Sequence, residues 1–377
     1  MKLPLRSIAG LVIVPLIMTL IIVDYVWERH YQTNSSLIDQ FNPISAPEND
    51  AILTDDSILK SYIKKYGPAP TMHTIIAAAN RTQIDCHNRA HEFGRMSYEV
   101  FGNTILQLNL PECHSGFYHG AIEAYFKKYG TDNLAEKLSF ICPDNLNGFF
   151  MHQCRHGIGH GLMSWSSYDL PAALDYCSMI TDEWGQGSCR GGVFMENIVG
   201  SLRDSPEAQE IGHYTEYLSE DPQFPCNAVK DEYKNDCYFL QTDRMLALSK
   251  TAFQGVVDSC TAAPEQYHRN CFASMGRTVG GSLRGQPAEA ISACRLIPDQ
   301  TNRIECIMGV SKDYLWDSSG QEGGLRFCSM VSVEDGMIEC YKALTDHARA
   351  VLNTEQLSSF CARIPQELYA ICQGSPS

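Results

Sequence analysis

The sequence predicts an all-α fold: an α-solenoid of disulfide-stapled helical hairpins behind an N-terminal transmembrane helix. Three observations predict it. An unbroken apolar run opens the chain, sixteen cysteines recur with a period of about 34 residues, and the segments before many of these cysteines start with helix-capping residues. A repeat period in the thirties is typical of helical-hairpin arrays.

The apolar run IAGLVIVPLIMTLIIV spans residues 8–23, and the aromatic residues that follow extend it to residue 27. This reaches the ~20 residues that a helix needs to cross a bilayer. No small-x-small cleavage site follows the run, so the sequence favours a single-pass signal anchor over 8–27. A cleaved signal peptide is the alternative interpretation.

Charges on either side of the anchor predict its orientation. Lys2 and Arg6 precede the apolar run, and Asp24 and Glu28 follow it. The positive-inside rule therefore places residues 1–7 in the cytoplasm and the rest of the chain outside, in a periplasm, a lumen or the cell exterior.

The remainder divides into a tether and a repeat domain. Residues 28–50 are polar and rich in Pro, Asn and Ser, which is typical of a flexible linker. Residues 51–377 hold all sixteen cysteines and are predicted to form one extracytoplasmic, Cys-rich helical repeat domain. Disulfides persist in oxidising compartments, so the cysteine count agrees with the predicted location.

Seven cysteine pairs share nearly constant spacing, and the two remaining cysteines form an eighth. Successive second cysteines are 32 to 35 residues apart, with one interval of 48. Zinc knuckles need a close Cys-x₂₋₄-Cys spacing, which is absent, so disulfides are favoured over zinc for these cysteines. Pairing of neighbours predicts Cys86–Cys113, Cys142–Cys154, Cys177–Cys189, Cys226–Cys237, Cys260–Cys271, Cys294–Cys306, Cys328–Cys340 and Cys361–Cys372.

The sequence around the cysteine pairs repeats as well. DLPAALDYC, GQPAEAISAC and NTEQLSSFC each precede a first cysteine and read as helix starts. We therefore expect a first helix ending near the first cysteine, a short loop, and a second helix opening near the second. A single hairpin cannot bury its own apolar face, so the units must stack. This architecture resembles that of secreted helical-repeat proteins with one disulfide per repeat; the likeness is architectural and carries over no functional residue.

Histidine is concentrated in the N-terminal third. Seven of the twelve histidines lie between residues 87 and 160, although the repeat scaffold continues beyond them. His87 and His91 are four residues apart, as are successive members of His152, His156 and His160, and that spacing puts side chains on one helix face. A requirement of the fold alone would have placed histidines along the whole array.

These patterns predict a metal or metal-cofactor site on the N-terminal repeats. Imidazole with carboxylate suits a transition metal such as Zn, Cu or Fe. The predicted ligands are His87, His91, His119, Glu123, His152, His156 and His160.

Two other functions stay open at this stage. The chain could be a protein–protein interaction scaffold at the membrane surface, with the histidines as packing residues and a partner on the curved face of the array. It could also be a metalloenzyme, with Glu123 or Glu196 as a general base, although no motif identifies a reaction. The net charge of −15 argues against nucleic acid as a partner, because phosphate binding needs a basic surface.

Overall fold

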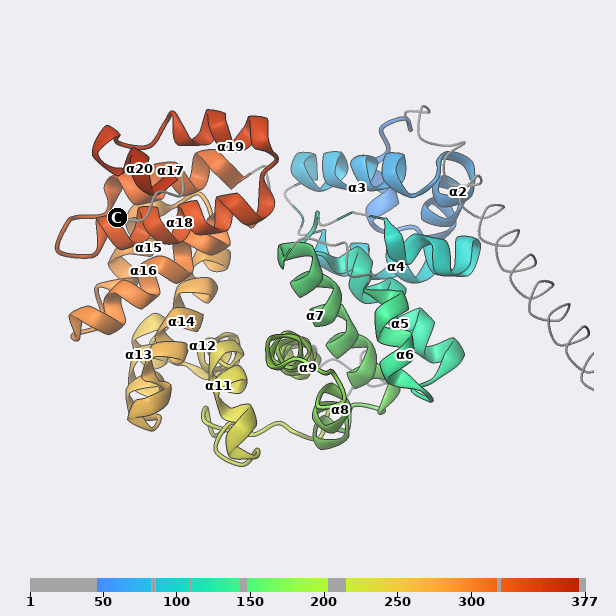
Figure 1. Ribbon diagram of the computed structural model, residues 1–377, viewed down its shortest axis with the longest axis horizontal. Helices are drawn as coiled ribbons and strands as arrows, with labels where there is room; N and C mark the ends of the chain where they lie inside the picture. The colour runs from blue at the N-terminus through green and yellow to red at the C-terminus, as the bar shows by residue number, and fades with distance from the viewer. Residues whose placement is uncertain are drawn as a thin grey trace, which may run out of the picture.

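The computed structural model describes residues 46–82, 84, 86–108, 110, 112–142, 148–202, 215–316 and 320–372 (Figure 1). The predicted cytoplasmic tail, the predicted membrane span and most of the predicted tether lie outside these ranges. Among the described residues, no helix combines the length and the apolar character that crossing a membrane requires.

The described chain is all-helical, as the sequence predicts, and it contains no strand within those ranges. The N-terminal part begins with the short 3₁₀ helix η1 (Asp50–Leu53) and the helix pair α2 (Asp56–Tyr66) and α3 (Pro68–Thr82). Asp55 caps α2 by accepting hydrogen bonds from the backbone N–H groups of Ser57 and Ile58, which are unpaired within the helix.

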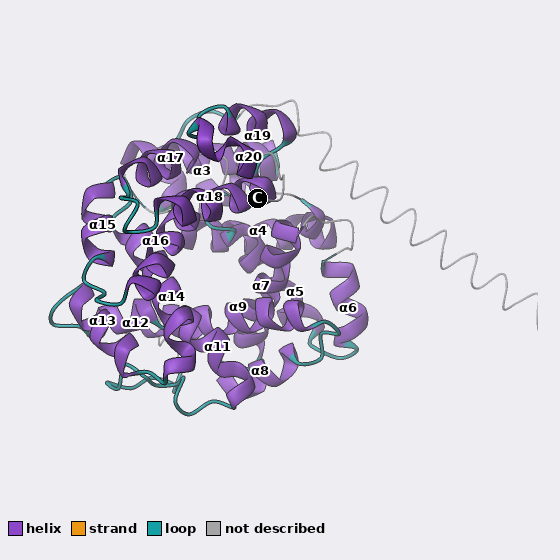
Figure 2. Cartoon of the chain, turned by 60° about the vertical axis from the view of Figure 1, so that its left-hand side comes forward, coloured by secondary structure: helices purple, strands orange, loops and turns teal. Residues whose placement is uncertain are grey.

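The helices after this pair alternate between two positions. The longer ones line up next to one another, and the shorter ones pack outside them (Figure 2). The inner helices are α4 (His87–Phe101), α5 (Gly116–Tyr129), α7 (Gly148–Trp165), α9 (Glu183–Leu202), α11 (Asp231–Leu240), α14 (His268–Ser282), α16 (Gln300–Tyr314) and α18 (Met337–Val351). The remaining helices are η2 (Gly102–Gln107), α6 (Leu134–Ile141), α8 (Leu170–Cys177), α12 (Thr242–Leu248), α13 (Phe253–Ala262), η3 (Glu265–Tyr267), α15 (Pro287–Cys294), α17 (Gln321–Met330), α19 (Thr354–Cys361), η5 (Gln366–Leu368) and α20 (Tyr369–Cys372).

Eight disulfides connect the sixteen cysteines, and they join the same neighbours that the spacing suggests. In most pairs the first cysteine lies at or near the end of an outer helix, as Cys177 ends α8 and Cys294 ends α15. The second lies one to two turns inside the next inner helix, not at its first residue, as Cys189 does in α9. Five bridges, Cys142–Cys154, Cys177–Cys189, Cys260–Cys271, Cys294–Cys306 and Cys328–Cys340, therefore fasten the end of an outer helix to the body of an inner one. The other three differ: Cys86 and Cys113 each lie just before an inner helix, Cys226 lies in a turn, and Cys372 ends α20. Eight disulfides indicate an oxidising, extracytoplasmic compartment.

Glycines allow unusually close packing between neighbouring inner helices. A Cβ atom on Gly120 of α5 would overlap the carbonyl oxygen of His91 on α4, and one on Gly192 of α9 would overlap that of His156 on α7. Because glycine has no Cβ, these backbones touch. The close approach brings side chains from four successive inner helices within reach of one another.

The last helix of the inner row contacts the N-terminal part of the row. Helix α18, near the C-terminus, contacts α7, and Figure 2 shows the helices arranged around a common centre. In this contact Phe149 of α7 lies edge-on to His347 of α18. Next to it Phe149 also lies edge-on to Trp316, which follows α16 and stacks on His114, before α5, with ring centroids 5.3 Å apart.

Candidate metal centre

Five histidines from three adjacent inner helices meet in the interior. Helix α4 supplies His87 and His91, α5 supplies His119, and α7 supplies His156 and His160. They form two overlapping groups of possible ligands, His87–His91–His119 and His119–His156–His160, and in each group one ligand atom per residue lies within 4.8 Å of the others. His119 belongs to both groups.

The facing nitrogens of the first group lie close together. Nε2 of His91 lies 3.3 Å from Nε2 of His87 and 3.1 Å from Nδ1 of His119. Nitrogens bound to one ion at ~2.0–2.1 Å are themselves ~2.9–3.4 Å apart at octahedral to tetrahedral angles. The two separations therefore match those between adjacent ligands of a single ion.

Hydrogen bonds fix which nitrogen of each ring faces the centre. His87 Nδ1 donates to the carbonyl oxygen of Cys113 at 2.9 Å, since a carbonyl can only accept. His91 Nδ1 lies 3.2 Å from Oε1 of Glu123 and donates to that carboxylate. Each ring, when neutral, then has a lone pair on Nε2. Two lone pairs 3.3 Å apart repel each other unless a cation or a proton lies between them.

Side chains from α9 also hold the rings of the second group. His160 Nδ1 donates to Oε2 of Glu196 on α9 at 2.7 Å, and both side chains are buried. Tyr168 Oη lies 3.4 Å from the other carboxylate oxygen. His156 Nε2 is 3.4 Å from the thioether sulfur of Met195, a soft donor next to the imidazoles.

Two ring nitrogens remain without a hydrogen-bond partner. Nε2 of His119 and Nε2 of His160 are buried and unpaired within the described structure, and the two rings stack with centroids 4.0 Å apart. Leaving a buried polar atom unpaired costs about 1–3 kcal/mol. A cation bound next to either ring would satisfy that nitrogen.

Burial favours the neutral form of three of the imidazoles, as metal binding requires. It places the pKa values of His87, His119 and His156 well below the ordinary value, and the neighbouring histidines push in the same direction. Burial alone would raise the pKa of Glu123, but its hydrogen bond to His91 and the charge of Arg95 outweigh burial and lower it. Arg95 Nη1 lies 2.7 Å from Glu123 Oε2. The Glu123 carboxylate is therefore ionised.

Not every predicted ligand reaches the centre. His152 belongs to neither group; its Nδ1 lies 2.8 Å from Ser188 Oγ. Glu123 contacts a ligand ring instead of the centre itself. Met195 and the hydrogen bond of Glu196 to His160 were not predicted as parts of the site. Their position, six and seven residues after Cys189, corresponds to that of His160 and Gly161 after Cys154, and this register is the signal that would have found them.

Two hollows accompany the centre. A cavity of about 800 Å³ lies between the two ends of the array, and its lining includes Cys113, His114 and Phe149. The ring of His114 is 6.2 Å from that of His87, so the cavity reaches the edge of the histidine cluster.

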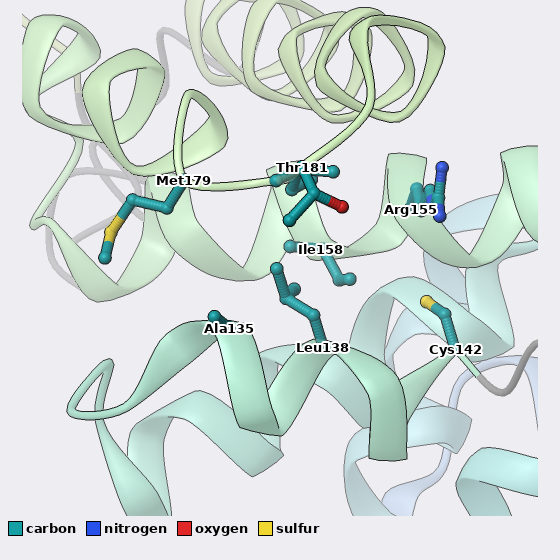
Figure 3. Close-up of a pocket in the computed structure, with 8 residues that line it drawn as sticks. Ala135, Leu138, Cys142, Arg155, Ile158, Met179 and Thr181 are labelled. Atoms are coloured by element: carbon teal, nitrogen blue, oxygen red, sulfur yellow. The ribbon is translucent and has the colours of Figure 1, made fainter.

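The second hollow is smaller and lies elsewhere. It measures about 230 Å³, is bounded by α6, α7 and the segment after α8, and includes Leu138, Arg155 and Thr181 (Figure 3). Arg155 pairs there with Asp182. No histidine lines this hollow, so it is separate from the centre.

The arrangement can bind a cation in a buried, nitrogen-rich interior whose ligands are oriented by carboxylates and a carbonyl. No protein-family model, no curated protein sequence and no solved structure matches this chain.

Proposed function

We propose that this chain is a membrane-anchored, extracytoplasmic α-solenoid that binds a late first-row transition-metal ion in its N-terminal repeats. His87, His91 and His119 would hold the ion. The observation that carries the proposal is the approach of His91 Nε2 to nitrogens of His87 and His119, at 3.3 and 3.1 Å, in a buried site.

The surroundings of these rings support metal over simple packing. Metal-bound histidines commonly donate their other N–H to a carboxylate or a backbone carbonyl. His87, His91 and His160 all do so. The buried carboxylate of Glu196 accepts the hydrogen bond of His160 and so orients that ring.

Chemistry narrows the class of ion. Imidazole nitrogen is the common ligand of zinc, copper and iron, whereas magnesium and calcium prefer oxygen. The sulfur of Met195 beside His156 adds a donor that soft ions accept. Copper and zinc therefore fit the cluster best.

Binding is better supported than catalysis. Glu123 and Glu196 are each hydrogen-bonded to a histidine, so neither carboxylate is positioned as a general base. The cavity next to His114 gives an ion a way to approach the cluster. A buried site that binds an ion without a free base is suited to delivering or storing the ion.

Elemental analysis of the full chain, purified in mild detergent without a histidine tag, tests the proposal. We expect stoichiometric transition metal in the wild type and its loss in the double variant His91→Gln/His119→Gln. The matched control is His73→Gln/His268→Gln, which changes two histidines outside the cluster. Thermal unfolding of the metal-free proteins verifies that all three fold.

A folded, fully disulfide-bonded wild type without metal after exposure to Zn²⁺ and Cu²⁺ would contradict the proposal. A proton on His91 would then separate the facing nitrogens, the histidines would be packing residues, and a search for a protein partner would follow.

A further inference from the structure

The two histidine groups share one ring, and that ring presents a different nitrogen in each direction. His119 Nδ1 faces His91 Nε2 at 3.1 Å, while His119 Nε2 is buried without a partner. The two nitrogens of an imidazole point away from each other, so both cannot bind the same ion. One ion at the first group gives His119 Nδ1 a partner and leaves His119 Nε2 without one.

The second group contains the other unexplained atom. His160 Nε2 is also buried and unpaired, and Nδ1 of that ring is engaged by Glu196. His156 completes the group, with its ligand atom within 4.8 Å of those of His119 and His160. Every atom left unpaired in the cluster thus belongs to this second group.

We propose that the cluster is a two-ion centre in which His119 bridges the ions. His87 and His91 complete the first site, and His156 and His160 complete the second. This inference rests on the proposed function and adds a second ion to it.

The donor atoms of the two sites differ. The first site has three nitrogens, with Glu123 and the Cys113 carbonyl oxygen behind them. The second has three nitrogens, with Glu196 behind His160 and the Met195 sulfur close to His156. A neutral imidazole carries one N–H proton, so binding both ions releases that proton of His119 to solvent. No redox step is involved.

The charge of the surroundings favours more than one cation. Glu123 and Glu196 are 6% and 3% exposed, so two carboxylates are buried behind the cluster. A second ion next to His160 lies on the side of the cluster that holds Glu196, where its positive charge offsets the buried carboxylate.

Stoichiometry is the first test. The metal-free full chain is titrated with Zn²⁺ against a chromophoric chelator, and we expect two equivalents bound. His87→Gln removes a ligand of the first site only, and His160→Gln removes one of the second only. Each variant should retain one equivalent, and His119→Gln should weaken both sites by at least tenfold.

A magnetic measurement tests the bridge itself. Two Cu²⁺ ions on opposite nitrogens of one imidazolate are spin-coupled, so the EPR intensity of the protein with two equivalents of Cu²⁺ should fall well below that of two isolated ions. Under the same loading, His160→Gln should show the full signal of one isolated ion.

The outcomes separate the two proposals. One equivalent in the wild type, abolished by His87→Gln and by His160→Gln alike, overturns the bridge but leaves a single metal site. Two equivalents with uncoupled spins also overturn the bridge. No bound Zn²⁺ or Cu²⁺ in a folded protein overturns the proposed function itself.

Discussion

Glu123 and Glu196 contribute to the centre through the rings that they hold. Each carboxylate accepts a hydrogen bond from Nδ1 of one histidine and so presents Nε2 to the interior. The same geometry explains why the two acids are buried although acidic side chains normally lie at the surface.

Replacing one of these carboxylates by its amide gives a residue-scale prediction. Glu123→Gln keeps the shape of the side chain but removes the charge that orients His91, so we expect metal affinity to fall about 10–100-fold. Competition with a chelator of known affinity measures the change. Glu99→Gln, at an exposed position on α4, the helix that carries His91, is the matched control and should leave the affinity unchanged. Equal affinity of both variants would exclude an orienting role for Glu123.

The sequence revealed part of the site at this scale. Spacing of four residues put His87 with His91 and His156 with His160 on one helix face, and the structure has both pairs facing the centre. The same spacing included His152, which bonds to Ser188 instead. Periodicity along one helix does not determine how far a neighbouring helix extends, so it could not separate His152 from the rest.

At the scale of elements, glycine contacts between inner helices determine how closely the ligands approach. Gly120 touches the backbone of His91 itself, so the spacing of α4 and α5 and the position of a ligand depend on the same contact. Helices α14 and α16 pack through Gly276 and Gly309 in the same way but carry no histidine at the contact. The close packing therefore belongs to the scaffold, and the N-terminal repeats place ligands on it.

This comparison leads to a matched pair of variants. Gly120→Ala and Gly309→Ala each force a methyl group against a backbone carbonyl, and each should destabilise the fold by about 1–3 kcal/mol. Only Gly120→Ala moves a metal ligand, so only that variant should lower metal affinity. Chemical denaturation and chelator competition measure the two effects. Equal loss of affinity in both variants would show that metal binding follows global stability and not the α4–α5 contact.

Hairpin order could be predicted from the cysteines because a disulfide every 34 residues or so leaves few ways to arrange the helices. The close contacts between helices could not be predicted from the sequence. Glycine in a helix also occurs where no neighbouring atom approaches, as at Gly281. Contacts between distant repeats, such as Trp316 with His114, leave no periodic signal at all.

At the scale of the whole molecule, buried neutral histidines tie stability to pH. Burial lowers the pKa of His347 to about 4, and Lys312 and His152 add to the shift. The unfolded chain has the ordinary value near 6.5. Between these values the unfolded state binds a proton that the folded state does not, so stability falls as pH decreases from about 6.5 to 4.

We therefore expect the metal-free protein to lose stability over that pH range, with about 1–3 kcal/mol of the loss due to His347. His87, His119 and His156 act in the same direction. Denaturant midpoints at pH 7.5, 6, 5 and 4 measure the loss. His347→Gln should reduce the slope, and His73→Gln, at an exposed position, should not. A slope unchanged by His347→Gln would contradict the assignment.

The contact between α18 and α7 also restricts how such a chain can evolve. In an open row of repeats, one unit can be duplicated or deleted and its neighbours simply close up. Here Trp316 stacks on His114, and an additional hairpin between them would shift Trp316 away from that ring. Related chains are therefore expected to vary in their loops and in the histidines, while the number of hairpins stays the same.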